Sequence, residues 1–167
     1  MYTTYGARPS ASVTADIDLW FQWYRADGIF VDEMDNTPGA HEPYYRALYQ
    51  HVQAQKPGAF VVGNPGTTST SDYLDGAFGR CASALCLYEN SAGFLGYAPD
   101  AWVLARARME FYALPYGTST ADWPAVVDHA FAAHFGWVYV TDDVLPNPWD
   151  TLPPYFEPLL DYLEVHY

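Results

Sequence analysis

Positively charged residues are scarce in this chain, and their scarcity excludes several classes of partner. Of its 167 residues, 7 are lysine or arginine and 20 are aspartate or glutamate, which gives a formal net charge of −13. Surfaces that bind phosphate groups need Lys and Arg, so we expect no nucleic-acid partner and no attraction to anionic membranes. Such a charge suits a cationic or neutral partner, and it equally serves to keep an aromatic-rich protein in solution.

Cysteines and long apolar runs are also scarce. Cys81 and Cys86 are too few for a disulfide framework, and their spacing fits no common zinc site. The five histidines do not pair with a carboxylate at helical spacing, so we expect no metal. No apolar run approaches the ~20 residues of a membrane-spanning helix, so we expect no membrane insertion. The segment Met1–Gly6 lacks the basic and apolar regions of a signal peptide.

Several enzyme motifs are missing as well. The chain contains no Gly-x-Ser-x-Gly elbow, no P-loop and no dinucleotide-binding fingerprint. These absences exclude the common serine hydrolases, nucleotidases and Rossmann dehydrogenases.

The chain does have strand-length apolar runs that end in carboxylates. These acids are Asp32 and Glu33 after Gly28–Val31, Glu89 after Leu85–Tyr88, and Asp142 and Asp143 after Gly136–Thr141. Ionised carboxylates are costly to bury, so acids at the ends of core strands indicate a site. In a parallel barrel the carboxyl ends of the strands converge on one face, where active sites lie. We therefore expect Asp32 and Glu89 to meet in one active site.

Strand and helix patterns alternate along the chain, as in α/β proteins built from β-α repeats. The expected strands are 1–6, 28–33, 60–66, 84–89, 107–114 and 136–141. The expected helices are 10–24, 41–55, 71–74, 99–104, 123–134 and 152–165. These make about six β-α units, whereas a closed (β/α)8 barrel has eight units and ~250 residues. We therefore expect a single domain, residues 1–167, with the fold of an incomplete (β/α)8 TIM-type barrel.

Five segments resemble, in the same order, the spherulin-4-like glycoside hydrolases, which have the TIM-barrel fold and are related to fungal enzymes that cut galactosaminogalactan. These segments are Tyr2–Arg8, Asp27–Met34, Val62–Gly66, Tyr88–Glu89 and Tyr139–Asp142. The resemblance covers essentially the whole chain, and its Asp-Gly-Ile-Phe-x-Asp-Glu segment is fairly specific. Family members carry two strands before the segment that matches Tyr2–Arg8, so the resemblance implies an N-terminally truncated barrel.

The resemblance also implies an activity, namely endo-acting hydrolysis of α-1,4-linked galactosamine or N-acetylgalactosamine polysaccharide without a cofactor. By motif, Asp32, Glu33 and Glu89 match the acidic active-site residues of the family. Asp32 would be the nucleophile or charge stabiliser, and Glu89 the general acid/base. A secreted or cell-surface location is implied too.

Hydrolysis of a glycosidic bond needs one carboxyl group that protonates the leaving oxygen and another that attacks the sugar or activates water. We expect the retaining arrangement, in which the two groups lie about 5 to 5.5 Å apart. Adjacent strand residues point to opposite faces, so Asp32 and Glu33 both project inward only if the strand ends between them. We expect Asp32 to point inward. The expected substrate-binding residues are Tyr5, Asn64, Tyr88 and Asp142.

Each candidate also has a purely structural interpretation. Asp32 and Glu33 fit a helix N-cap followed by a first-turn acid, and Glu89 fits a loop acid paired with Arg106 or Arg108. Asn64 and Asp142 fit turns, whereas Tyr5 and Tyr88 fit core packing. For the whole chain, the alternatives are a non-catalytic carbohydrate-binding or cell-surface protein and a fragment that is inactive alone. The oligomeric state is left open.

Overall fold

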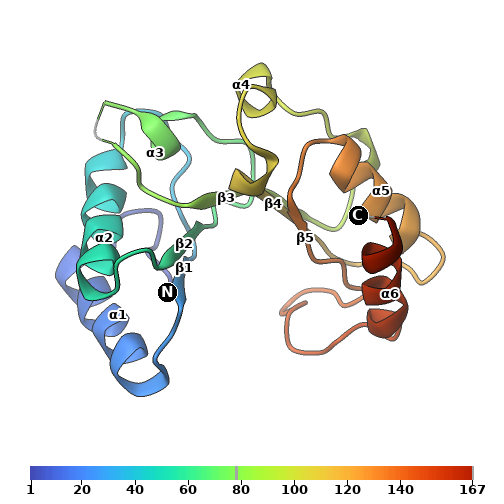
Figure 1. Ribbon diagram of the computed structural model, residues 1–167, viewed down its shortest axis with the longest axis horizontal. Coiled ribbons are helices and arrows are strands. Elements are labelled where there is room, and N and C mark those ends of the chain that lie inside the picture. The colour runs from blue at the N-terminus through green and yellow to red at the C-terminus, as the bar shows by residue number, and fades with distance from the viewer. Residues whose placement is uncertain (78, 167) are drawn as a thin grey trace. The chain divides into compact units, whose positions relative to one another are not determined.

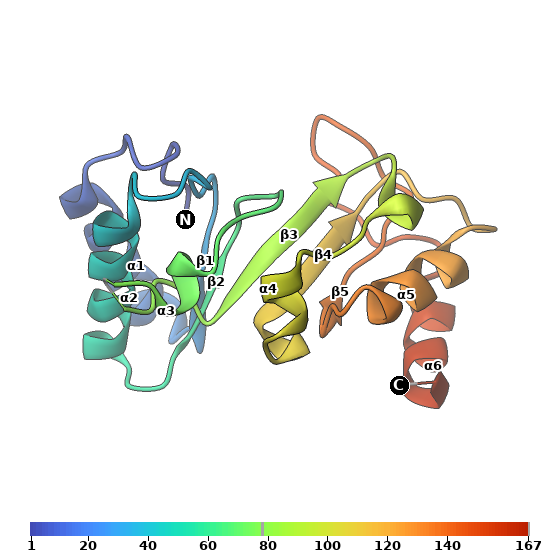
Figure 2. The same ribbon diagram turned by 90° about the horizontal axis from the view of Figure 1, so that it is seen from above.

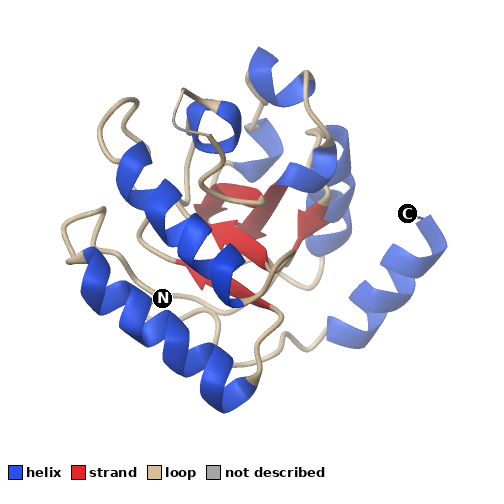
Figure 3. Cartoon of the chain, turned by 60° about the vertical axis from the view of Figure 1, so that its left-hand side comes forward, coloured by secondary structure: helices blue, strands red, loops and turns tan. Residues whose placement is uncertain are grey.

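The computed structural model describes residues 1–77 and 79–166 as a mixed α/β fold. Its five strands lie in the order β1-β2-β3-β4-β5, which is also their order in the sequence. The pairs β1–β2, β2–β3 and β4–β5 are parallel. Helices, blue in Figure 3, connect the red strands along the chain. The expected α/β class with a parallel sheet is therefore confirmed.

The chain divides into two compact units, Met1–Leu87 and the part from Tyr88 onward. The first unit contains α1 (Ser10–Tyr24), β1 (Gly28–Val31), α2 (Glu42–Gln55), β2 (Phe60–Gly63), α3 (Asp72–Asp75) and most of β3 (Ala84–Asn90). The second contains the end of β3, the 3-10 turns η1 (Phe94–Gly96) and η2 (Arg108–Glu110), α4 (Ala101–Leu104), β4 (Phe111–Pro115), α5 (Trp123–Ala132), β5 (Trp137–Val138) and α6 (Phe156–His166). The single domain stays a prediction.

Helices α1 and α2 lie side by side in the first unit (Figure 1). The buried apolar residues of each helix recur at helical spacing, Val13 and Ile17 in α1 and Tyr45, Leu48 and Val52 in α2. The buried side chains of this core include Val13, Ile17, Leu48, Val52, Ile29, Val31, Val61 and Leu85. Strand β1 alternates buried and more exposed residues, whereas β3 is buried over its first four residues. The core therefore holds the carboxyl end of β1 in place.

The N-terminal segment forms a single parallel bridge, between Tyr2 and Asp32, where a strand over 1–6 was expected. The amide of Asp32 donates to the Met1 carbonyl at 2.6 Å, and the amide of Thr3 donates to the Asp32 carbonyl at 3.0 Å. The backbone then enters a left-handed turn at Thr4 and Tyr5, both with φ of 52°. This turn ends the pairing, because a strand requires extended backbone.

The expected strand over 107–114 was placed too early. Arg108–Glu110 forms a 3-10 turn, and β4 begins only at Phe111. The guanidinium of Arg106 donates to the carboxylate of Glu110 at 2.8 and 3.1 Å. This ion pair between residues four apart is compatible with a curled backbone but not with an extended one.

In the second unit, β4 pairs with β5, and α5 packs against α6 (Figure 2). The ring of Trp123 in α5 lies 5.7 Å from Tyr155 and 5.4 Å from Tyr162 of α6, measured between ring centroids. Strand β5 is shorter than the expected 136–141. Beyond it, the amide of Thr141 still donates to the carbonyl of Pro115 at 3.2 Å. In the described part of the chain, no helix combines the length and apolar character needed to cross a membrane.

Gly28 begins β1 where the backbone of β2 leaves no room for a side chain. A Cβ atom at this position would lie 2.2 Å from the carbonyl oxygen of Phe60. We expect Gly28→Ala to lower the free energy of unfolding by about 1–3 kcal/mol, because the strands must move apart. Chemical denaturation measures this loss. Gly96→Ala is the control, since its Cβ would meet nothing within 4 Å. Equal stability of the two variants would contradict the steric argument.

Candidate functional site

The carboxyl end of β1 carries Asp32 and Glu33, both partly exposed. The strand ends at Val31, and Glu33 has a left-handed backbone with φ of 51°. The alternation of strand side chains is therefore broken between the two acids, which removes the objection to their facing the same way. The next helix, α2, begins only at Glu42, so the N-cap interpretation of Asp32 and Glu33 is wrong.

Asn64 lies beside Asp32, at the carboxyl end of the neighbouring strand β2. Its side-chain amide donates to Oδ1 of Asp32 at 2.9 Å. The backbone amide of Glu33 donates to the same oxygen, also at 2.9 Å. Asn64 is itself buried, and its backbone amide donates to the carbonyl of Val31 at 2.8 Å. Two donors, the Asn64 side chain and the Glu33 backbone, thus fix the orientation of the Asp32 carboxylate through one of its oxygens.

The turn after Tyr2 places Tyr5 next to Glu33. The amide of Tyr5 donates to the carbonyl of Glu33 at 2.8 Å, and the amide of Thr4 donates to its carboxylate at 3.1 Å. The Tyr5 side chain is 60% exposed, so core packing is wrong for this residue. The first unit therefore brings together four of the expected site residues, which are Tyr5, Asp32, Glu33 and Asn64.

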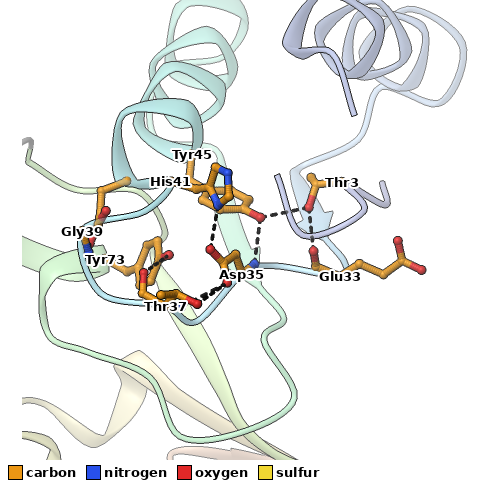
Figure 4. Close-up of polar contacts among 9 residues, drawn as sticks. Thr3, Glu33, Asp35, Thr37, Gly39, His41, Tyr45 and Tyr73 are labelled. Carbon is orange, nitrogen blue, oxygen red and sulfur yellow. Dashed lines mark hydrogen bonds and ion pairs between the residues drawn. The ribbon is translucent and has the colours of Figure 1, made fainter. Parts of the chain in front are cut away.

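A polar network that the sequence did not predict adjoins Glu33 (Figure 4). The hydroxyl of Tyr45 is 2.8 Å from the amide of Asp35 and 3.2 Å from the hydroxyl of Thr3. The Asp35 carboxylate is 2.6 Å from Nδ1 of His41 and accepts from the amide and hydroxyl of Thr37 at 3.1 and 2.9 Å. Burial works to raise the pKa of Asp35, but the hydrogen bonds from His41 and Thr37 outweigh it and lower that pKa.

In the second unit, Tyr88 and Glu89 lie half-buried near the carboxyl end of β3. The Tyr88 hydroxyl donates to the carbonyl of Ala92. Its ring packs against Phe94 and Tyr97, with centroids 4.6 and 5.9 Å away. These contacts favour a packing role for Tyr88.

The two arginines named as alternative partners of Glu89 make contacts of their own. Arg106 binds Glu110, and Arg108 donates to the carbonyl of Phe131 at 2.5 Å. The assignment of Glu89 to catalysis stays a prediction.

A groove of about 300 Å³ adjoins the end of β3 in the second unit. Its walls come from the loops that follow β3 and β4 and from the start of α5. The lining residues are those of 90–96 and 115–119, together with Asp122 and Val126. This volume suits a small ligand such as a sugar. The sequence offered one signal for the groove, which is that both loops directly follow strands.

Asp142 is exposed in the loop after β5, and this loop is joined to the groove wall. The amide of Thr118 donates to the carbonyl of Thr141 at 2.9 Å, and the amide of Gly117 to that of Asp143 at 2.7 Å. Asp143 instead shapes the turn, because its carboxylate accepts from the amide of Val144 and the hydroxyl of Thr151, both at 2.8 Å.

Among the described residues, no three histidine, cysteine, aspartate or glutamate side chains form a group that could hold a metal ion. Cys81 and Cys86 are both buried. Burial raises the pKa of the Cys81 thiol to about 12. Cys86 is fully buried in β3, where it packs as a small core residue.

The fold defines an α/β protein with acidic residues at the carboxyl ends of parallel strands, where such folds place their sites. The family described as "Spherulation-specific family 4" matches residues 1–163, and the chain belongs to this family. The expected resemblance to spherulin-4-like proteins is thereby confirmed.

Two individual proteins are similar to the chain. Spherulin-4 of Physarum polycephalum is 28% identical over 152 residues, which cover 85% of this chain and 44% of Spherulin-4. The crystal structure of Aspergillus clavatus Sph3 in complex with GalNAc has a TM-score of 0.78 at 20% sequence identity. That match covers 98% of this chain and 70% of Sph3. The chain thus spans less than half the length of Spherulin-4.

Proposed function

We propose that the chain is a glycoside hydrolase of TIM-barrel type that cleaves α-1,4-linked galactosamine and N-acetylgalactosamine polysaccharide. The observation that carries this proposal is the Asp32 carboxylate, held at the end of β1 by Asn64 and the Glu33 amide at 2.9 Å each. Membership of the spherulin-4 family and the likeness to a structure that contains GalNAc support it.

In the proposed retaining reaction, Oδ2 of Asp32 attacks the anomeric carbon while Glu89 gives its proton to the leaving oxygen. The sugar is then held as an ester of Asp32. Water attacks the same carbon, Glu89 takes the proton from this water, and the Asp32 carboxylate leaves. Hydrogen bonding to Oδ1 suits this role, because it orients the carboxylate and leaves the second oxygen for the attack. The two carboxyl groups must lie about 5 to 5.5 Å apart.

Substrate binding is assigned to the residues around these acids. Tyr5 offers an exposed ring on which a sugar can stack, and the groove beside Asn90 offers space for a further sugar unit. Asp142 is exposed in the loop that is hydrogen-bonded to the groove wall, and we assign it to an ammonium or hydroxyl group of the substrate. A partly deacetylated polymer is cationic, so the net charge of −13 attracts it at long range. A polysaccharide substrate is in keeping with secretion or a cell-surface location.

The test is to incubate the purified chain with partly deacetylated α-1,4-galactosamine polymer and to measure new reducing ends. Partly deacetylated chitosan is the control, because it carries the same charge on a different sugar and linkage. We expect new reducing ends from the first polymer only. Binding without cleavage would support the alternative of a non-catalytic carbohydrate-binding protein. If the chain neither bound nor cleaved this polymer, the proposal would be overturned.

A further inference from the structure

We propose that Tyr45 is a positioning residue for the acidic pair, which it serves through one chain of hydrogen bonds. This inference rests on the proposed function, because it assigns Tyr45 to the orientation of Asp32 and Glu33. Tyr45 belongs to α2 and is 1% exposed, so it acts from the core and does not touch substrate.

The chain of contacts leads from Asp35 through Tyr45 and Thr3 to Glu33 (Figure 4). The amide of Asp35 donates to the Tyr45 hydroxyl at 2.8 Å, and this hydroxyl lies 3.2 Å from the hydroxyl of Thr3. The Thr3 hydroxyl donates to the carbonyls of Glu33 at 2.8 Å and Asp32 at 3.1 Å. Thr3 is fully buried, and its contact with the Tyr45 hydroxyl is buried as well.

The positions of the protons follow from the partners. A carbonyl only accepts, so the single hydroxyl proton of Thr3 is used on Glu33 and Asp32. Tyr45 must therefore donate its own proton to Thr3, and its oxygen accepts from the Asp35 amide. All the bonds point in one direction, from the amide of Asp35 to the carbonyl of Glu33. Burial raises the pKa of Tyr45, which keeps this proton in place.

The network binds the backbone of Glu33, the residue of the acidic pair that has a positive φ angle. Glu33 has φ of 51°, a conformation that a residue other than glycine keeps only when its surroundings impose it. The Tyr45–Thr3 link ties the carbonyl of Glu33 to the amide of Asp35, on either side of Met34. Met34 is itself buried. Loss of the link lets this backbone relax, and Asp32 and Glu33 then lose their orientation.

The first test is Tyr45→Phe, which removes the hydroxyl and keeps the ring. We expect kcat to fall about 10- to 100-fold with KM changed less than about twofold, because geometry is lost and binding is not. The matched control is Tyr73→Phe. Tyr73 is also fully buried, its ring lies 5.8 Å from that of Tyr45, and its hydroxyl donates to the carbonyl of Thr37 at 3.5 Å. We expect kcat of this control to change less than about twofold.

Variants of Thr3 test the chain as a unit. Thr3→Val keeps the shape and removes the hydroxyl, so it should lose as much kcat as Tyr45→Phe. The double variant should lose no more than either single variant, because both break the same link. Thr3→Ser restores the hydroxyl and should recover most of the rate. Additive losses, or no recovery with serine, would overturn the proposal.

A second measurement does not depend on activity. Hydrogen exchange of the amides of 33–35 should become about 5- to 10-fold faster in Tyr45→Phe than in Tyr73→Phe, the effect of one lost hydrogen bond. If the unmutated chain hydrolyses nothing and exchange still rises, the proposed function fails and the structural tie stands. Two results with an active unmutated chain would overturn the positioning proposal. In one, Tyr45→Phe changes neither hydrogen exchange nor kcat. In the other, it changes hydrogen exchange and leaves kcat unchanged.

Discussion

Asp32→Asn is expected to reduce hydrolysis by about 10³- to 10⁵-fold, because an amide cannot form the glycosyl ester that the carboxylate forms. The fold should be preserved. The side-chain oxygen of asparagine can still accept from the Asn64 side chain and the Glu33 amide, as Oδ1 of Asp32 does at 2.9 Å. The measurement is the release of reducing ends under saturating polymer, together with the midpoint of thermal unfolding.

The control for Asp32 stands at the other end of the same strand. Asp27 immediately precedes β1, and its exposed carboxylate binds Lys56. Asp27→Asn makes the same chemical change, but at the amino end of the strand, so we expect less than about a twofold change in rate. Equal losses in the two variants would mean that charge, and not the position of Asp32, carries the activity.

Glu89→Gln is expected to have the second largest effect, a loss of about 10²- to 10⁴-fold on the polymer. The loss should be much smaller on an aryl glycoside, whose leaving group departs without a proton. Azide should restore the rate on the aryl glycoside, since it attacks the sugar ester without the help of a general base. The product would be a glycosyl azide with the configuration of the substrate.

Glu157→Gln is the matched control, because Glu157 is an exposed acid in the first turn of α6. It should keep its rate on both substrates. If Glu89→Gln lost equal activity on both substrates and azide restored nothing, Glu89 would not be the acid/base. A glycosyl azide of inverted configuration would contradict the proposed retaining mechanism and favour an inverting one.

The elements of this fold could be predicted where the signal is local. The apolar spacing in 41–55 predicts a helix, and α2 spans Glu42–Gln55. The strand over 107–114 was misplaced because its outcome depends on the ion pair of Arg106 with Glu110, which competes with extended backbone. The spacing of apolar residues carries no information about this ion pair, so it could not predict where the strand begins.

Some features of the candidate site could likewise be predicted from the sequence, and others could not. Asp32 was expected at the carboxyl end of a strand and Asn64 among the substrate-binding residues, and the two side chains are hydrogen-bonded. The Tyr45–Thr3 contact joins residues 42 apart, so no local pattern of the sequence reveals it. The left-handed backbone of Glu33 also escaped prediction, since glutamate rarely adopts it. The meeting of Asp32 and Glu89 in one cleft stays a prediction.

The backbone at Glu33 has a consequence for how this protein tolerates heat. Glycine would adopt a φ of 51° without steric cost, so glutamate makes the chain less heat-resistant than it would be with glycine there. A protein engineered only for a higher melting temperature would gain by giving up this acid. Thermal stability therefore favours glycine at this position, whereas the proposed active site favours glutamate.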